Sequence, residues 1–326
     1  MMVLDTGSKD NTVTLAKAAG AQVHSFKWVD SFAIARNAAL KIAAADWHLV
    51  ADADEWLESG AECLPELRAG HPNQIGNVLV RSQVDSPGRA GVLAAWLPRF
   101  LPGPVRYCGR IHEQLDTALP MVNIPLTFGH DGYCDEQMRV KRGRNEQLLR
   151  AALLESPDDS YTLFQLGSEL YGSLSYVEAI EMFTQSLRLT PAKAQYRAAL
   201  IYRFLCTLQA AREWAIAANL LEQEMQTYST ERTFMLTVGN LFWAWAQHQP
   251  TRASNLLPMA ENAWMQVLHL EQYPGVEQGY QLENVGERAA RSLAVLCRNL
   301  GQDARAGQFE AIADKKGRLG GVTTRM

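Results

Sequence analysis

The feature that most constrains this chain is a short apolar run that opens directly into a cluster of acids. Residues 47–51, Trp-His-Leu-Val-Ala, are too few for a helix and predict a buried strand of a parallel sheet. Asp52, Ala53, Asp54 and Glu55 follow at once. Because side chains alternate along an extended chain, Asp52 and Asp54 are expected to project to one side and share a hard cation. The carboxyl end of a strand is also where open α/β sheets bind their ligands.

Strand and helix patterns alternate through the first 130 residues. Apolar, β-type segments predict strands at residues 1–4, 21–26, 76–81, 92–100 and 124–128. Helices are predicted at about residues 10–19 and 32–44, the second with Ser31 as its N-cap, and Pro87-Gly88 predicts a turn. Strands that alternate with helices indicate an α/β domain with a mainly parallel sheet.

The pattern from residue 136 onward is helical. Between Leu163 and Pro191, small and large apolar residues match the tetratricopeptide consensus, and two weaker copies follow. One such repeat cannot bury its apolar face alone, so several stacked units are expected. The sequence therefore predicts an α/β domain in residues 1–134, a connecting helix in 135–157, all-α tetratricopeptide-like repeats in 158–314 and a flexible tail in 315–326.

Composition narrows the class of protein. With 47% hydrophobic and 20% charged residues, the 326-residue chain is typical of soluble globular proteins. A net charge of -4 argues against binding to nucleic acid, which depends on neutralising phosphates. The five cysteines lack the close pairs of a zinc site or a disulfide framework, so reduced thiols are expected. No apolar run is long enough to form a transmembrane segment, and a cytoplasmic protein is expected.

Four further motifs accompany the acids. They are Val-Leu-Asp-Thr-Gly-Ser-Lys-Asp at residues 3–10, the segment 28–37 ending in Arg-Asn, Gly-Arg-Ile-His-Glu-Gln at 109–114, and His-Asp-Gly-Tyr at 130–133. In order and spacing they resemble the nucleotide-sugar domain of family 2 glycosyltransferases, in the bacterial subgroup that carries tetratricopeptide repeats. The resemblance implies a GT-A fold, as in nucleotide-diphospho-sugar transferases. Family members begin with a further strand and helix, so we expect a domain truncated at its N-terminus.

The resemblance also implies a divalent cofactor, Mn²⁺ or Mg²⁺, which as a Lewis acid would stabilise the diphosphate leaving group. Asp54 would contact the ion directly, and Asp52 would lie closer to the ribose or sugar of the donor. His112 and His130 are further candidate ligands, through neutral imidazole. A lone histidine is as often structural, so both interpretations of His130 stay open.

Donor-binding residues are implied in the same way. Asp5 matches the aspartate that contacts the nucleoside base, and Arg36 and Asn37 match positions near the donor, as does Asp52. Arg110 would pair with phosphate. Without the resemblance, Arg36 and Asn37 fit an exposed helix surface and Arg110 fits a surface salt bridge equally well.

The implied reaction is an inverting transfer of sugar from a nucleotide-diphosphate donor to a glycan, a lipid-linked molecule or a peptide or protein. It needs a base for the acceptor hydroxyl, and a carboxylate is the usual choice. Glu113 is the first candidate, and Asp131 is the rival.

Two other functions were weighed against glycosyl transfer. Val-Leu-Asp-Thr-Gly-Ser also looks like an aspartic protease signature, but those enzymes need a second carboxylate motif in a mostly β fold. This chain has no second Asp-Thr/Ser-Gly, so the protease is excluded. The remaining alternative is a catalytically inactive, truncated copy whose helical repeats bind a protein partner.

Overall fold

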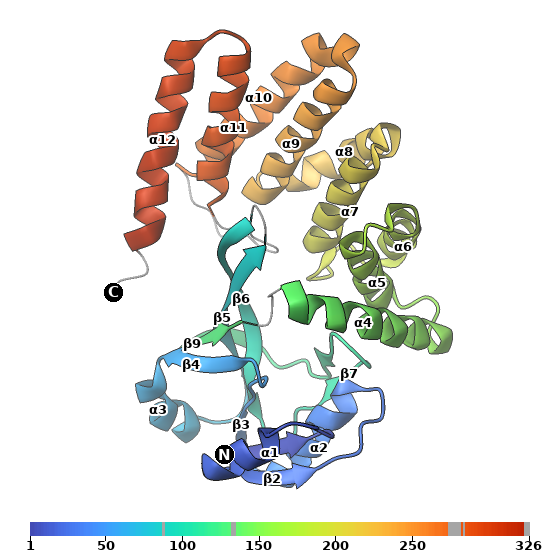
Figure 1. The fold of residues 1–326 in the computed structure, drawn as a ribbon, viewed down its shortest axis with the longest axis vertical. Helices are drawn as coiled ribbons and strands as arrows, with labels where there is room; N and C mark the ends of the chain where they lie inside the picture. Colours follow the sequence, from blue (N-terminus) through green and yellow to red (C-terminus); the bar gives the residue numbers. More distant parts are fainter. Residues whose placement is uncertain (87–88, 132–134, 273–281, 283, 323–326) are drawn as a thin grey trace. The chain divides into compact units, whose positions relative to one another are not determined.

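The computed structural model describes residues 1–326 except 87–88, 132–134, 273–281, 283 and 323–326 (Figure 1). Contacts divide the chain into two compact units, Met1–Pro157 and Asp158–Met326. In the described residues, the first unit contains the strands and the second is built from helices. The predicted α/β domain followed by tetratricopeptide-like helices is confirmed.

The first unit combines strands and helices in the following order. They are β1 (Met2–Asp5), α1 (Thr12–Ala18), β2 (Gln22–Ser25), α2 (Phe32–Ala43), β3 (Trp47–Leu49), β4 (Glu55–Ser59), α3 (Leu64–Ala69), β5 (Ile75–Ser86), β6 (Arg89–Pro102), β7 (Tyr107–Cys108), β8 (Gln114–Leu115), β9 (Met121–His130) and α4 (Asp135–Glu155). β1 and β2 form a two-stranded parallel sheet, and β7 and β8 form a short antiparallel pair. The main sheet has the strand order β3-β6-β5-β9-β4.

Local signals fixed the start of α2 as predicted. Ser31 is extended, and its Oγ accepts a hydrogen bond from the Ile34 N–H at 3.3 Å. Ala44 ends the helix in the left-handed conformation. The helix buries Ala33 and Leu40 against the main sheet, which turns the adjoining Arg36 and Asn37 toward β7.

The expectation of a mainly parallel sheet is wrong. Among the described strands of the main sheet, β5 and β9 are parallel, whereas β3–β6, β5–β6 and β4–β9 are antiparallel. β5 and β6 are consecutive and joined by residues 87–88, a link too short for a parallel crossover. The predicted Pro87-Gly88 turn itself lies outside the described residues. β3 is a three-residue edge strand that pairs antiparallel with β6, and its residue Leu49 is exposed. The prediction of a buried parallel strand at this place is therefore wrong.

β3 and β4 are consecutive in the chain but lie at opposite edges of the main sheet. Through the ladder, Leu49 is level with Gly76 of β5, and Glu55 is level with Ser82. Four strand spacings across and six residues along a flat sheet would separate Leu49 from Glu55 by about 27 Å. Six residues of extended chain reach at most about 20–22 Å.

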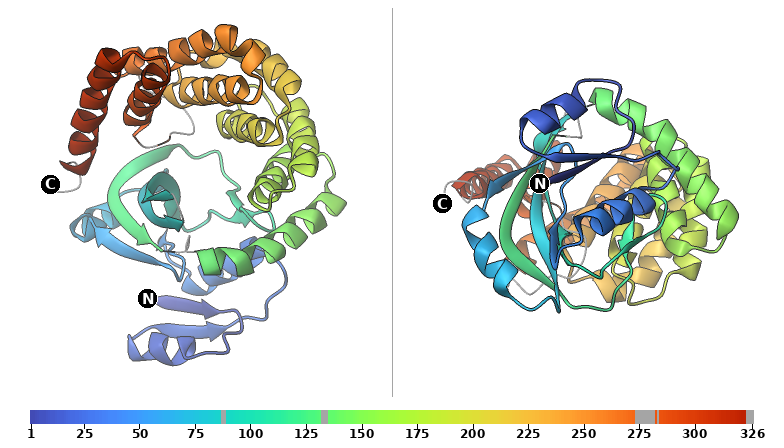
Figure 2. Two further views of the ribbon diagram at one scale, coloured as in Figure 1. Left: turned by 45° about the horizontal axis from the view of Figure 1, so that its top comes forward. Right: turned by 90° about the horizontal axis from the view of Figure 1, so that it is seen from below.

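The main sheet must therefore be strongly coiled, so that its two edges approach each other. Figure 2 shows β9, coloured green, bent into an arc. The register shifts at Gly76–Asn77 and Leu57–Ser59, which mark bulges or irregular pairing, contribute to this curvature. The coiling allows the short segment between β3 and β4, with its acids, to join the two edges of the sheet.

Two apolar clusters pack on the main sheet. The clusters lie on opposite faces of the sheet. Successive residues of β6 therefore belong to different clusters, because successive side chains of a strand point to opposite faces. Leu101 joins the cluster under α2, whereas Phe100 joins a second cluster under α3 that includes Leu67. Arg99 therefore points to the same face as Leu101.

The second unit consists of consecutive helices. They are α5 (Ser160–Gly172), α6 (Tyr176–Leu189), α7 (Arg197–Ala211), α8 (Trp214–Tyr228), α9 (Arg232–His248), α10 (Ala253–Leu270), α11 (Val285–Asn299) and α12 (Asp303–Val322). α5 packs on α6, α9 on α10 and α11 on α12. Glycines permit close approach: a Cβ on Gly167 would lie 2.8 Å from the ring of Phe183. α12 continues to Val322, past residue 315, where a flexible tail was expected.

No helix in the described ranges is both long enough and apolar enough to cross a membrane.

Candidate active site

Asp52 lies between two arginines. Its Oδ1 accepts from Arg36 Nη2 at 2.6 Å and its Oδ2 from Arg99 Nη2 at 2.8 Å. Arg36 comes from α2 and Arg99 from β6, so a helix and a strand hold one carboxylate. Its side chain is 35% exposed, which leaves an edge of the carboxylate open to solvent.

Each arginine also contacts a second carboxylate. Arg36 Nε donates to Glu113 Oε1, and Arg99 Nη2 donates to Glu55 Oε1 at 2.5 Å. The second oxygen of Glu55 accepts from the Asp52 N–H at 2.9 Å. We call these five residues the Asp52 network. Burial opposes the charge on both guanidiniums, but the combined attraction of two carboxylates outweighs it. These are Asp52 and Glu113 at Arg36, and Asp52 and Glu55 at Arg99. The pKa of each guanidinium is therefore raised.

Tyr107 supports the network from β7. The Arg36 guanidinium lies 5.4 Å from the centre of its ring, a cation–π contact. Burial raises the pKa of the Tyr107 hydroxyl to about 12. This hydroxyl has no hydrogen-bond partner among the described residues. Asn37, one position after Arg36, hydrogen-bonds to the Tyr107 backbone.

Asp54 faces a different group. Its Oδ2 lies 3.4 Å from Nε2 of His130, at the end of β9. The other ring nitrogen, Nδ1, lies 2.9 Å from Ser82 Oγ in β5. The two aspartates thus meet different partners, an imidazole for Asp54 and two guanidiniums for Asp52. They do not alternate as in a strand because the segment turns, with the Glu55 N–H donating to the Asp52 carbonyl at 3.0 Å.

The fit to a divalent ion depends on these two environments. Within the described residues, no group of three or more His, Cys, Asp or Glu side chains is arranged to hold a metal ion. Asp54 and His130 nevertheless place a carboxylate and an imidazole side by side, and ions bound with nucleotides take remaining ligands from phosphate and water. The pair therefore fits a cation that binds together with a diphosphate. Two guanidiniums at Asp52 would repel such an ion.

The structure distributes the remaining sequence candidates over the first unit. Asp5 ends β1 and accepts from the Ser8 N–H at 3.1 Å. Arg110 donates to the Asp30 carbonyl at 3.4 Å and to the Glu155 carboxylate. These contacts are separate from the Asp52 network.

The two remaining candidates lie near turns. His112 occupies the turn between β7 and β8 with a positive φ of 50°, one position before Glu113. Asp131 is exposed, and its N–H donates to the Asp54 carbonyl at 3.4 Å, which places it directly beyond the Asp54–His130 pair.

Four residues of this region were missed by sequence reasoning: Arg99, Glu55, Tyr107 and Ser82. Arg99 carried a usable signal, because a single arginine inside an apolar strand predicts a buried ion pair. Ser82 carried none, since its contact with His130 spans 48 residues of sequence.

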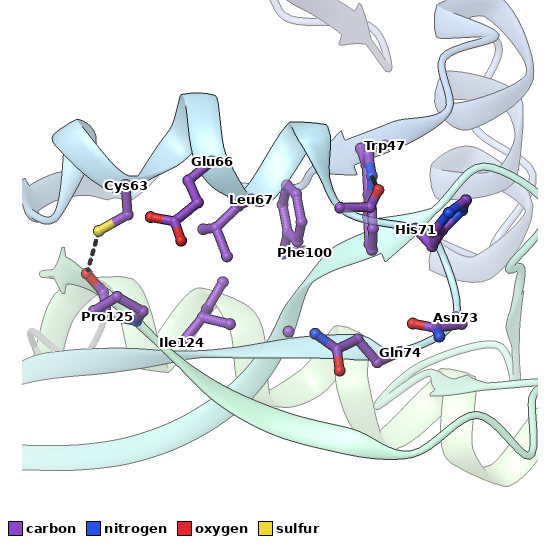
Figure 3. A pocket seen from close by; sticks show the side chains of 12 residues that line it. Trp47, Cys63, Glu66, Leu67, His71, Asn73, Gln74, Phe100, Ile124 and Pro125 are labelled. Carbon is purple, nitrogen blue, oxygen red and sulfur yellow. Dashed lines mark hydrogen bonds between the residues drawn. The ribbon is translucent and has the colours of Figure 1, made fainter.

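A hollow of about 420 Å³ lies elsewhere, under α3 (Figure 3). Trp47 and Phe100 stack in it with ring centres 4.4 Å apart, and Trp47 Nε1 donates to the Gly70 carbonyl at 3.2 Å. Because Phe100 and Arg99 point to opposite faces of β6, the hollow and the Asp52 network lie on opposite faces of the main sheet.

Comparison with known proteins finds a family model to which the N-terminal region is similar. Residues 1–89 match the sequence model of Glycosyl transferase family 2. The match includes Arg36, Asp52 and Asp54, and confirms the resemblance for this part of the chain.

Two curated relatives cover both units. A TPR repeat-containing protein of Synechococcus elongatus is 30% identical over 217 residues, which are 62% of this chain and 53% of that protein. The SPbeta prophage-derived glycosyltransferase SunS of Bacillus subtilis is 27% identical over 203 residues, which are 57% of this chain and 46% of SunS. The chain spans about half the length of these relatives. Among solved structures, that of MamA covers 57% of this chain and 96% of its own at 15% identity, with a TM-score of 0.42.

Proposed function

We propose that the first unit transfers a sugar from a nucleoside diphosphate to an acceptor by inverting displacement. One observation carries this proposal: the family match over residues 1–89 contains the acids of the turn between β3 and β4. The relation to SunS, itself a glycosyltransferase, supports the same class of reaction.

Asp54 and His130 are the residues we assign to a divalent cation, which when bound supplies positive charge to the diphosphate leaving group. Asp52 has a different role in this proposal. Its two guanidinium partners fix its orientation, and its exposed edge accepts hydrogen bonds from the ribose or sugar hydroxyls of the donor.

Glu113 is the base in this proposal, with Asp131 as the rival. The pair with Arg36 uses Oε1, so Oε2 is the oxygen that takes the proton from the acceptor hydroxyl. As that proton leaves, the acceptor oxygen bonds to the anomeric carbon and the bond from this carbon to the diphosphate oxygen breaks. A single displacement of this kind inverts the anomeric configuration.

Binding measurements test the proposal directly. The whole chain is titrated by calorimetry with UDP-, GDP- and dTDP-sugars in the presence of Mn²⁺, as wild type, Asp54→Ala and Asp46→Ala. Asp46 is the matched control, because it is an exposed aspartate next to β3. At least one donor should bind wild type and Asp46→Ala, and Asp54→Ala should lose that binding. Equal binding by Asp54→Ala removes Asp54 from the site, and no binding of any donor to wild type contradicts the proposed reaction.

A second function is favoured by the TPR repeat-containing relative and the helical second unit. In this alternative, the helices bind a protein partner and the first unit is inactive. The two functions separate in the same titration, because an inactive copy binds no donor. Donor binding together with partner binding would instead indicate that the helices present a peptide or protein acceptor.

A further inference from the structure

We infer that Ser82 is a positioning residue that orients the His130 ring and allows the imidazole to change tautomer when a cation binds. This inference rests on the proposed cation site at Asp54 and His130. Neither the sequence motifs nor the comparisons assign a role to Ser82.

The geometry fixes which atoms meet. Ser82 and His130 are register partners in the parallel pairing of β5 with β9. Ser82 is 8% exposed, and its Oγ lies 2.9 Å from His130 Nδ1. On the other side of the ring, Nε2 lies 3.4 Å from Asp54 Oδ2. The ring is thus held between a hydroxyl and a carboxylate.

The carboxylate decides the tautomer of neutral His130 without a cation. An ionised carboxylate only accepts hydrogen bonds, so Nε2 must carry the ring proton to bond with Asp54. Nδ1 then has a lone pair. Ser82 completes the arrangement by donating its O–H to Nδ1.

A cation reverses these requirements. To bind an ion beside Asp54, Nε2 must present its lone pair, so its proton leaves to solvent and another arrives at Nδ1. The ring stays neutral and the proton count does not change. Nδ1–H then donates to Ser82 Oγ, whose hydroxyl proton rotates away.

Only a group that both donates and accepts can serve the two states. A carbonyl or carboxylate at this position would hold Nδ1–H permanently, and an apolar side chain could bond to Nδ1 in neither state. A hydroxyl satisfies Nδ1 before and after binding. Groups that orient a metal-ligating histidine in this way are typically worth about 10–100-fold in metal affinity.

Ring-nitrogen NMR and metal affinity test the inference on the whole chain. Long-range ¹H–¹⁵N spectra report the tautomer of His130, which His130→Ala identifies by loss of its signals, and Zn²⁺ serves as the diamagnetic probe. Wild type should change from protonated Nε2 to protonated Nδ1 when Zn²⁺ binds. Mn²⁺ affinity is measured separately, by electron paramagnetic resonance of the free ion.

Ser82→Ala should keep the proton on Nε2 without metal, because Asp54 still accepts from it, but should bind Mn²⁺ about 10–100-fold more weakly. Ser82→Thr keeps the hydroxyl and should behave as wild type. Thr127→Ala, which removes a hydroxyl elsewhere on β9, is the matched control and should change neither reading. Circular dichroism confirms that the variants fold.

The outcomes separate the two levels of the proposal. If wild type binds Mn²⁺ but Ser82→Ala keeps the wild-type affinity, or the wild-type ring keeps its proton on Nε2 when Zn²⁺ binds, the role of Ser82 is overturned and the cation site stands. If wild type binds neither Mn²⁺ nor Zn²⁺, the cation site itself is overturned.

Discussion

Asn37 and Tyr107 are joined by two hydrogen bonds of 2.8 Å, in which Asn37 Nδ2 donates to the Tyr107 carbonyl and Asn37 Oδ1 accepts from the Tyr107 N–H. The side chain thus acts as a backbone partner for β7. It ties α2 to the strand that carries the aromatic ring next to Arg36. This geometry favours a positioning role for Asn37 over direct contact with a donor.

Asn37→Ala should therefore lower the stability of the protein. It leaves a backbone N–H and a carbonyl without their partner, and each such group costs about 1–3 kcal/mol when buried. Urea unfolding measures the change. The control Asn219→Ala, on the exposed surface of α8, should stay within about 0.5 kcal/mol of wild type. Equal effects of both substitutions would contradict the role assigned to Asn37.

Arg99→Met should destabilise the first unit by about 3–5 kcal/mol, because it leaves the carboxylate of Glu55, which is 3% exposed, without its counter-charge. Adding Glu55→Gln should recover part of the loss. In contrast, Arg81→Met at the more exposed Arg81–Glu58 pair should change stability by less than about 1 kcal/mol. Chemical denaturation of the variants compares the two sites, and similar losses would show that burial does not govern them.

Tyr107 gives the first unit a specific response to alkaline pH. Its folded pKa of about 12 lies above the unfolded value near 10, so folding favours the neutral phenol. Its contribution to stability is fully present below pH 10 and is lost as the pH rises toward 12, by about 3 kcal/mol in total.

Tyr107→Phe should remove this component of the pH dependence. Because its buried hydroxyl has no partner among the described residues, the substitution should cost little stability at neutral pH. Unfolding curves of wild type and variant at several pH values from 9 to 12 provide the check. Parallel losses in both proteins would assign the response to other groups.

Glu113→Gln should reduce sugar transfer by about a hundredfold to ten-thousandfold while leaving donor affinity nearly unchanged, because the lost proton transfer belongs to the transition state. Turnover and donor binding are measured on the same preparation. Asp131→Asn is the comparison. If Asp131→Asn alone stops transfer, Asp131 is the base and the motif at Glu113 has another role.

In the helical unit, Gly167→Ala should be destabilising by about 1–3 kcal/mol, since its new methyl group would press against the buried ring of Phe183. Gly172 ends the same helix, and a Cβ there meets nothing within 4 Å. Gly172→Ala should therefore be neutral or slightly stabilising through helix propensity. Thermal unfolding of the pair tests whether this contact, and not helix propensity, requires glycine.

Features with a local cause were predictable from the sequence. Ser31 starts α2 because its side chain caps the next turn, and Gly167 faces Phe183 because the repeat consensus encodes that pairing. The main sheet was predicted less well. Its antiparallel pairs follow from the long β5–β6 hairpin and from the pairing of strands that are distant in sequence. The alternation of strands with helices carries no information about either feature.

The candidate site divides in the same way. The acids were found because they are adjacent in sequence, but their partners were not. Arg99 meets Asp52 across 47 residues and Ser82 meets His130 across 48. Such contacts result from the pairing of strands that are distant in sequence, which single-sequence patterns do not encode.

The short connection between opposite edges of the main sheet also limits how freely its acids can move. A short segment that is fixed at both ends and closed by the hydrogen bond from the Glu55 N–H to the Asp52 carbonyl has few conformations available to it before any ligand arrives. Holding Asp52 and Asp54 in place for a ligand then removes little further conformational entropy, whereas each residue of a slack loop costs about 1–2 kcal/mol to fix. The curvature of the sheet thus helps to pre-organise the two carboxylates, because it allows so short a connection to join the two edge strands.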